Sequence, residues 1–185
     1  MIDAYNPEAW HDFFLAAAGA AAALTGLLFV GLSLHVRFIA SSSLHRNMAR
    51  GSLIGLVLVL IASLIILMPE SPLWMGVELV ALNLVYIVFV GGYQLSIYRR
   101  MEWRVPTGSI LRQGLGILLA LLGVVGGFTL AVESGGGLYI AALVVSAIVV
   151  WNLRNAWSLL MGVVDEDIAA GVAGEEGGDI RRRDG

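Results

Sequence analysis

Five long stretches of this chain carry almost no charged residues, and each is long enough to cross a lipid bilayer. A helix of about 20 predominantly apolar residues spans the hydrocarbon core. The composition agrees, because 14% of the residues are charged and 58% are hydrophobic, whereas a soluble domain is roughly one-quarter charged. A soluble globule of this composition would lack the polar surface that it needs. The sequence therefore predicts an integral membrane protein.

The five stretches are expected to be helices, because backbone groups in lipid must be hydrogen-bonded within their own segment. A transmembrane barrel would show short runs of alternating polarity instead. The fold class predicted is thus an all-α membrane protein with a transmembrane domain over residues 13–164. Its helices run over about 13–36, 51–69, 73–98, 113–132 and 138–163.

Two short segments flank this domain. Residues 1–12 are acidic and lack the basic start of a signal peptide, so we expect the first helix to remain as an anchor. Residues 165–185 are rich in acidic residues and glycine, which predicts a disordered tail.

The arginines of the connecting loops predict an orientation. They fall in the loops after the first and third helices, at Arg37, Arg46, Arg50, Arg99, Arg100, Arg104 and Arg112. The opposite side carries acidic residues and no basic ones, at Asp3, Glu8, Asp12, Glu70, Glu78 and Glu133. Short loops rich in arginine stay in the cytoplasm. We therefore predict that the N-terminus is outside and the C-terminus inside. All eleven basic residues are arginine, which indicates a GC-rich bacterial genome, so the membrane expected is the bacterial inner membrane.

Small residues recur at helical spacing in the first and fourth predicted helices. Gly19 and Gly26 are seven residues apart in the first, and Gly116, Gly123 and Gly127 share one face of the fourth. Helices in lipid gain little from apolar burial against each other, so their close packing relies on small residues. These faces predict close helix contacts, either within one copy of the chain or between copies in a homo-oligomer.

Polar residues inside the predicted spans form a second group of candidates. Arg154, Asn155 and Ser158 follow Trp151 at helical spacing on the fifth helix. A charge near the bilayer centre costs at least about 2.5 kcal/mol. Two interpretations follow. Either the stripe faces the bundle interior, a wet cavity or an anion, or Arg154 extends to the inner headgroups with Trp residues beside it.

The third predicted helix offers partners for the first of these interpretations. Asn83, Tyr93 and Gln94 lie broadly on one face, at depths that overlap the inner half of the fifth helix. Neutral amides and a phenol could hydrogen-bond a guanidinium group. A purely structural role for these polar groups is the alternative.

Nothing in the sequence indicates catalysis or a bound cofactor. The chain has no cysteine, and its three histidines do not converge as a metal or haem site requires. A nucleophile motif and a phosphate-binding loop are also missing. We therefore predict a protein that is not an enzyme, with no cofactor, no metal and no nucleic-acid partner.

The segments AWHDFFLAAAGAAAALTGLLFVGLSL and RNAWSLL carry a family resemblance. With them the chain resembles small multi-pass membrane proteins of actinobacteria and related bacteria, some of which are labelled modulators of the membrane protease FtsH. The resemblance implies a membrane partner, with a membrane protease as one suggestion. Its motifs are packing motifs, so it assigns no functional residue.

Two functional classes remain. A pore needs a polar lining that is continuous across the membrane, and the second and fourth helices contribute little more than Ser63 and Thr129. We therefore favour a regulatory or structural subunit that binds other membrane proteins. A small homo-oligomeric channel, with Arg154, Asn155 and Ser158 as its polar stripe, is the alternative.

Overall fold

The computed structural model describes residues 4–34, 43–100 and 107–157. These residues form helices and turns without any strand. A short 3-10 helix η1 (Pro7–Trp10) leads into α1 (His11–Leu34), and α3 (Ser43–Leu67), α4 (Pro72–Arg100) and α5 (Thr107–Ala131) follow. A further helix, here called the fifth span, covers Gly137–Trp157. Within these residues, five helices are long and apolar enough to cross a membrane, as the five apolar stretches predicted.

Two helices extend beyond their apolar stretches. α3 begins at Ser43 and α5 at Thr107, well before the expected starts at 51 and 113. The length of an apolar run determines only the part of a helix that spans the lipid. The helix itself can continue into the polar, arginine-containing sequence that precedes the run. The predicted ends of the first and last helices, at 36 and 163, lie outside the described residues. So do residues 1–3 of the N-terminal segment and the whole tail 165–185.

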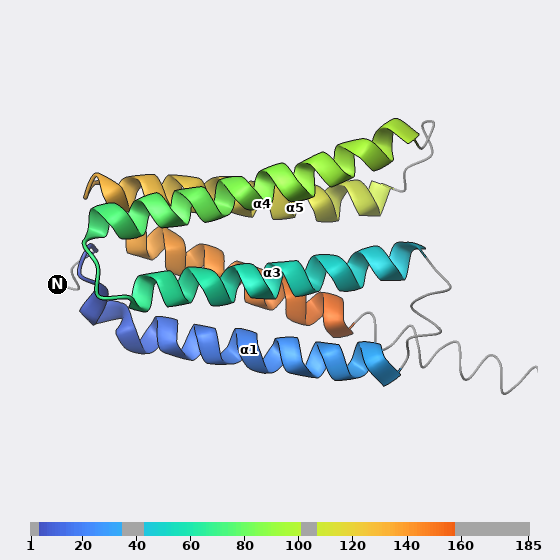
Figure 1. Ribbon diagram of the computed structural model, residues 1–185, viewed down its shortest axis with the longest axis horizontal. Coiled ribbons are helices and arrows are strands. Elements are labelled where there is room, and N and C mark those ends of the chain that lie inside the picture. Colours follow the sequence, from blue (N-terminus) through green and yellow to red (C-terminus); the bar gives the residue numbers. More distant parts are fainter. Residues whose placement is uncertain (1–3, 35–42, 101–106, 158–185) are drawn as a thin grey trace, which may run out of the picture.

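The helices form two antiparallel pairs that the fifth span joins (Figure 1). α4 packs along α5, and α1 packs along α3, whereas α3 and α4 touch less extensively. The fifth span runs obliquely behind α3, between the pairs (Figure 1). It contacts α5 closely, since a Cβ atom at Gly137 would lie 2.6 Å from Cα of Leu130. It also contacts α3, where Asn152 faces Gly55.

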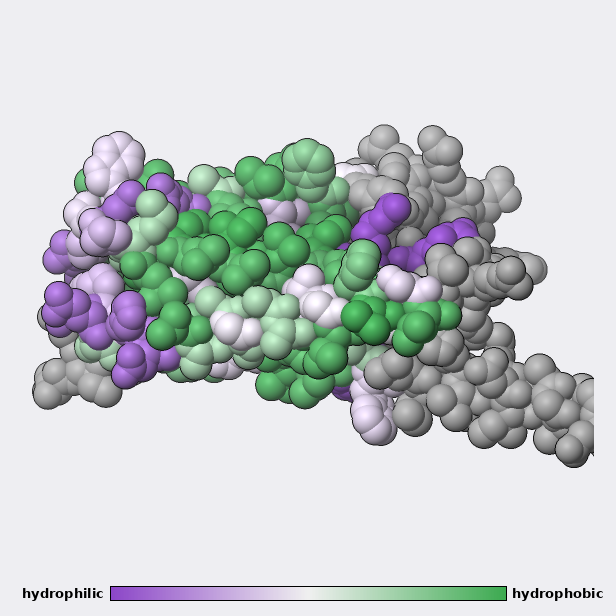
Figure 2. Space-filling view, turned by 60° about the horizontal axis from the view of Figure 1, so that its bottom comes forward, coloured by the Kyte–Doolittle hydropathy of each residue, from purple (hydrophilic) through white to green (hydrophobic). Residues whose placement is uncertain are grey.

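The surface is hydrophobic around the middle of the bundle and hydrophilic towards its ends (Figure 2). Large apolar side chains are exposed on all five helices, including Phe29, Leu64, Phe89, Phe128 and Leu143. A soluble monomer rarely exposes a continuous apolar patch of more than a few hundred Å². This band suggests a multi-pass membrane protein.

Candidate packing surfaces and buried polar groups

α4 and α5 approach each other closely at a pair of glycines. A Cβ atom at Gly76 would lie 2.5 Å from the carbonyl oxygen of Gly127 and 2.6 Å from the backbone nitrogen of Ala131. A Cβ atom at Gly127 would lie 2.8 Å from the carbonyl oxygen of Gly76. Each glycine thus leaves the space that the other helix's backbone occupies, which is the packing that small residues permit in lipid.

The other two glycines of the α5 stripe also face α4. A Cβ atom at Gly123 would collide with the amide of Asn83, with 2.7 Å to Cγ. One at Gly116 would lie 3.2 Å from the hydroxyl oxygen of Tyr86. Asn83 is 5% exposed, and its Nδ2 donates a 2.8 Å hydrogen bond to the carbonyl oxygen of Leu79 in its own helix. The glycine stripe of α5 therefore lies against α4 within one chain.

A second asparagine makes the same arrangement between the fifth span and α3. Asn152 is 4% exposed, and its Nδ2 donates a 2.8 Å hydrogen bond to the carbonyl oxygen of Ile148. A Cβ atom at Gly55 would lie 2.7 Å from that nitrogen. In both places the amide binds a carbonyl one turn earlier, and a glycine on the facing helix leaves room for it.

Asn152 is not among the candidates that the sequence predicts. A faint signal exists, because Asn152 continues the line of Ala141, Val145 and Ile148 at intervals of three or four residues. All three of those residues are buried. Because most faces of this helix are apolar, the sequence does not distinguish this buried row from the rows that face outwards.

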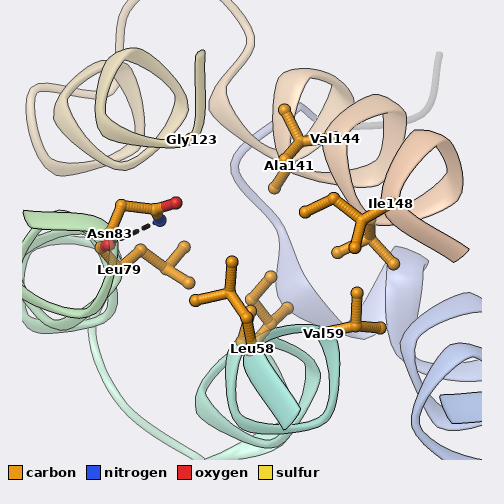
Figure 3. A pocket seen from close by; sticks show the side chains of 11 residues that line it. Leu58, Val59, Leu79, Asn83, Gly123, Ala141, Val144 and Ile148 are labelled. Carbon is orange, nitrogen blue, oxygen red and sulfur yellow. Dashed lines mark hydrogen bonds between the residues drawn. The ribbon is translucent and has the colours of Figure 1, made fainter. Parts of the chain in front are cut away.

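A small cavity lies inside the bundle, between α3, α4, α5 and the fifth span (Figure 3). Its volume is about 20 Å³, enough for about one water molecule. Asn83 is its one polar lining side chain, and the others are Leu58, Val59, Ala62, Ile66, Leu79, Ala141, Val144, Val145 and Ile148, with Gly123. The space is thus neither wide enough nor polar enough to conduct ions.

The buried polar groups are separate from one another. Within the described residues these are Ser52, Ser63, Asn83 and Asn152. Both asparagines donate within their own helices, and neither serine hydroxyl has a hydrogen-bond partner. No hydrogen bond joins any two of the four.

The two described members of the polar stripe expected on the fifth helix do not lie in the bundle interior. Arg154 is exposed, with its guanidinium carbon 5.6 Å from the centre of the Trp151 ring. Asn155 is half-buried, and Ser158 lies outside the described residues. Tyr93 and Gln94 belong to α4, but their side chains are outside the part of the chain that the structure describes. Of the polar candidates whose side chains the structure describes, only Asn83 lies in the bundle interior.

The glycines of α1 face away from the bundle. Gly19 and Gly26 are exposed, and a Cβ atom at either would meet no described atom within 4 Å. At about 100° per residue they lie nearly opposite Ala21 and Leu28 on the helix circumference. Those two residues are buried.

The N-terminal segment is attached to the start of the fifth span. The hydroxyl oxygen of Tyr5 accepts a 2.8 Å hydrogen bond from the backbone N–H of Gly136. The rings of Trp10 and Tyr139 meet edge to face at 4.7 Å between centroids. Trp10, expected at the membrane boundary, is half-buried in this aromatic contact.

Comparison with known protein families, with curated proteins and with solved structures gives no match to this chain. Among the described residues, no group of three or more His, Asp or Glu side chains could hold a metal ion.

Proposed function

We propose that this chain is a multi-pass protein of the bacterial inner membrane that acts as a non-enzymatic structural or regulatory subunit. In this proposal its N-terminus is outside, and α1 packs against a transmembrane helix of another membrane protein. The partner is either a second copy of the chain or a different protein, with a membrane protease as one candidate.

The observation that carries the proposal is the outward direction of the α1 glycines. Gly19 and Gly26 are exposed together with Ala22 and Ala23. The large side chains of the helix that are buried, Phe14 among them, lie on the other face. Hydrophobic burial does not drive association in lipid, but a surface of small residues allows two backbones to approach closely. A helix whose only task was to face lipid would have no need of such a surface.

A channel inside a single chain is less well supported. Ion conduction requires polar groups or a water-filled space across the whole membrane. The cavity inside the bundle is lined by apolar side chains apart from Asn83. The buried polar groups of the described residues share no hydrogen bond. These observations favour a partner-binding role over transport through a single chain.

Leucine substitutions on two exposed helix faces test the proposal. Gly19→Leu and Gly26→Leu should each reduce the oligomer mass or the amount of co-purifying membrane protein in mild detergent, because the added side chain prevents close approach. Gly92→Leu is the matched control, since Gly92 is exposed on α4 and a Cβ atom there would meet no described atom within 4 Å. Unchanged mass and unchanged partners in both α1 variants would refute the proposed role of this face.

A further inference from the structure

The face of the fifth span that points away from the bundle carries one arginine among large apolar residues. Leu143, Val150, Arg154 and Trp157 share this face at helical spacing. Val150 is 67% exposed and Trp157 is 63% exposed, and Arg154 is exposed as well. Asn152 lies on the opposite, buried face. In a membrane-inserted protein, Arg154 therefore faces lipid.

Arg154 lies near one end of the hydrocarbon region. It follows Gly137 by about 25 Å along the helix at about 1.5 Å per residue, in a core that is about 30 Å thick. The same end of the bundle holds the first turns of α3, because Ala156 packs against the buried cluster that contains Ala49 (Figure 1). Arg46 and Arg50 are exposed on those turns of α3. This end of the surface therefore carries several positive charges.

The surroundings of Arg154 suit a phosphate group. A guanidinium group keeps its charge at any accessible pH and carries five N–H donors in a planar fork, which matches the geometry of phosphate oxygens. Its carbon lies 5.6 Å from the Trp151 ring centre, in a cation–π contact that restrains the side chain on the helix surface. Trp157, one turn further on, is exposed at the depth where indole rings prefer to lie.

From this juxtaposition we infer that Arg154, Trp151 and Trp157 form a binding site for an anionic phospholipid in the leaflet at the arginine-bearing end. The guanidinium fork binds the phosphate oxygens. The two indole rings contact the glycerol and upper acyl region. The inference rests on the membrane insertion that the proposed function includes, but it is independent of partner binding through α1.

Lipid selectivity after reconstitution tests the site. The full chain is inserted into vesicles of equal parts phosphatidylglycerol and phosphatidylcholine, and flotation verifies insertion. It is then extracted in mild detergent, and the retained lipids are quantified by class. Wild type should be enriched in phosphatidylglycerol. Arg154→Gln should lower this enrichment about fivefold, since the loss of one net hydrogen bond to the phosphate costs about 1 kcal/mol.

Matched variants separate a local site from general charge. Arg46→Gln removes one exposed arginine at the same end and should change the enrichment less than about twofold. Trp157→Leu should lower it by an intermediate amount. Arg154→Lys keeps the charge but loses the planar fork, so it should retain only part of the enrichment, which provides a second measurement if the Gln variant does not insert. Millimolar inorganic phosphate should displace little of the bound lipid.

Several outcomes would overturn the inference. One is that Arg154→Gln inserts and retains the same enrichment as wild type, and another is that Arg46→Gln loses as much enrichment as Arg154→Gln. Full displacement by inorganic phosphate would assign the site to a free anion instead. If wild type itself fails to float with the vesicles, membrane insertion and hence the proposed function is wrong, a result distinct from loss of selectivity.

Discussion

The α4–α5 contact and the outer face of α1 are built from the same kind of residue and are used in opposite ways. On α5, Gly123 and Gly127 lie against α4, with backbone or amide atoms where a side chain would be. On α1, Gly19 and Gly26 meet no described atom within 4 Å. A glycine stripe thus indicates that a helix can be approached closely. It does not say whether the neighbour belongs to the same chain.

The largest effect should come from Gly76→Ala. The new Cβ atom would lie 2.5 Å from the carbonyl oxygen of Gly127, and a backbone atom cannot move aside as the end of a side chain can. We expect a loss of about 3 kcal/mol in the free energy of unfolding, at the upper end for overpacked sites. Denaturant titration in mixed micelles measures it, with Gly92→Ala as control. Equal stability of the two variants would mean that α4 and α5 are further apart.

A smaller effect is expected from Gly123→Ala, whose Cβ atom would meet the amide of Asn83. The amide can rotate only by giving up its hydrogen bond to Leu79, so we predict a loss of about 1–2 kcal/mol. Asn83→Ala should relieve the collision. The double variant should therefore lose less free energy of unfolding than the two single variants together, by at least about 0.5 kcal/mol. Strict additivity would show that the two residues do not touch.

The smallest effect on the isolated chain should come from Gly19→Ala and Gly26→Ala. Neither Cβ atom would meet a described neighbour, and alanine is the better helix former. The free energy of unfolding of the monomer should change by no more than about 0.5 kcal/mol. Thermal denaturation under conditions that keep the protein monomeric measures this. A loss as large as that of Gly123→Ala would place the α1 glycines in a contact within the chain, and the comparison would fail.

The five helices could be predicted from sequence because hydrophobic length alone determines them. The direction in which each helix faces could not. A soluble helix reveals its buried side by alternating polar and apolar faces, but here lipid and bundle interior are both apolar. The fifth span illustrates the difficulty. Arg154 drew attention to the face it shares with Trp157, whereas the amide in the interior is Asn152, two residues before it.

Gly76 was missed for a related reason. Its helix has no second glycine one turn away, so the sequence shows no stripe there. The close contact is made by a single glycine on α4 opposite several on α5. A pattern search within one helix detects only half of such an interface, because the other half is defined by the partner.

The hydrogen bond between Tyr5 and Gly136 joins residues 131 positions apart, which constrains the order of assembly during synthesis. At about 5–20 residues per second, translation reaches the fifth span on the order of ten seconds after Tyr5 has been made. During that interval α1 can pack against α3, but the aromatic contact between Trp10 and Tyr139 cannot yet exist. The segment just before α1 therefore acquires this contact only after the fifth span has been made. The rate of translation therefore sets the earliest time at which the bundle can be complete.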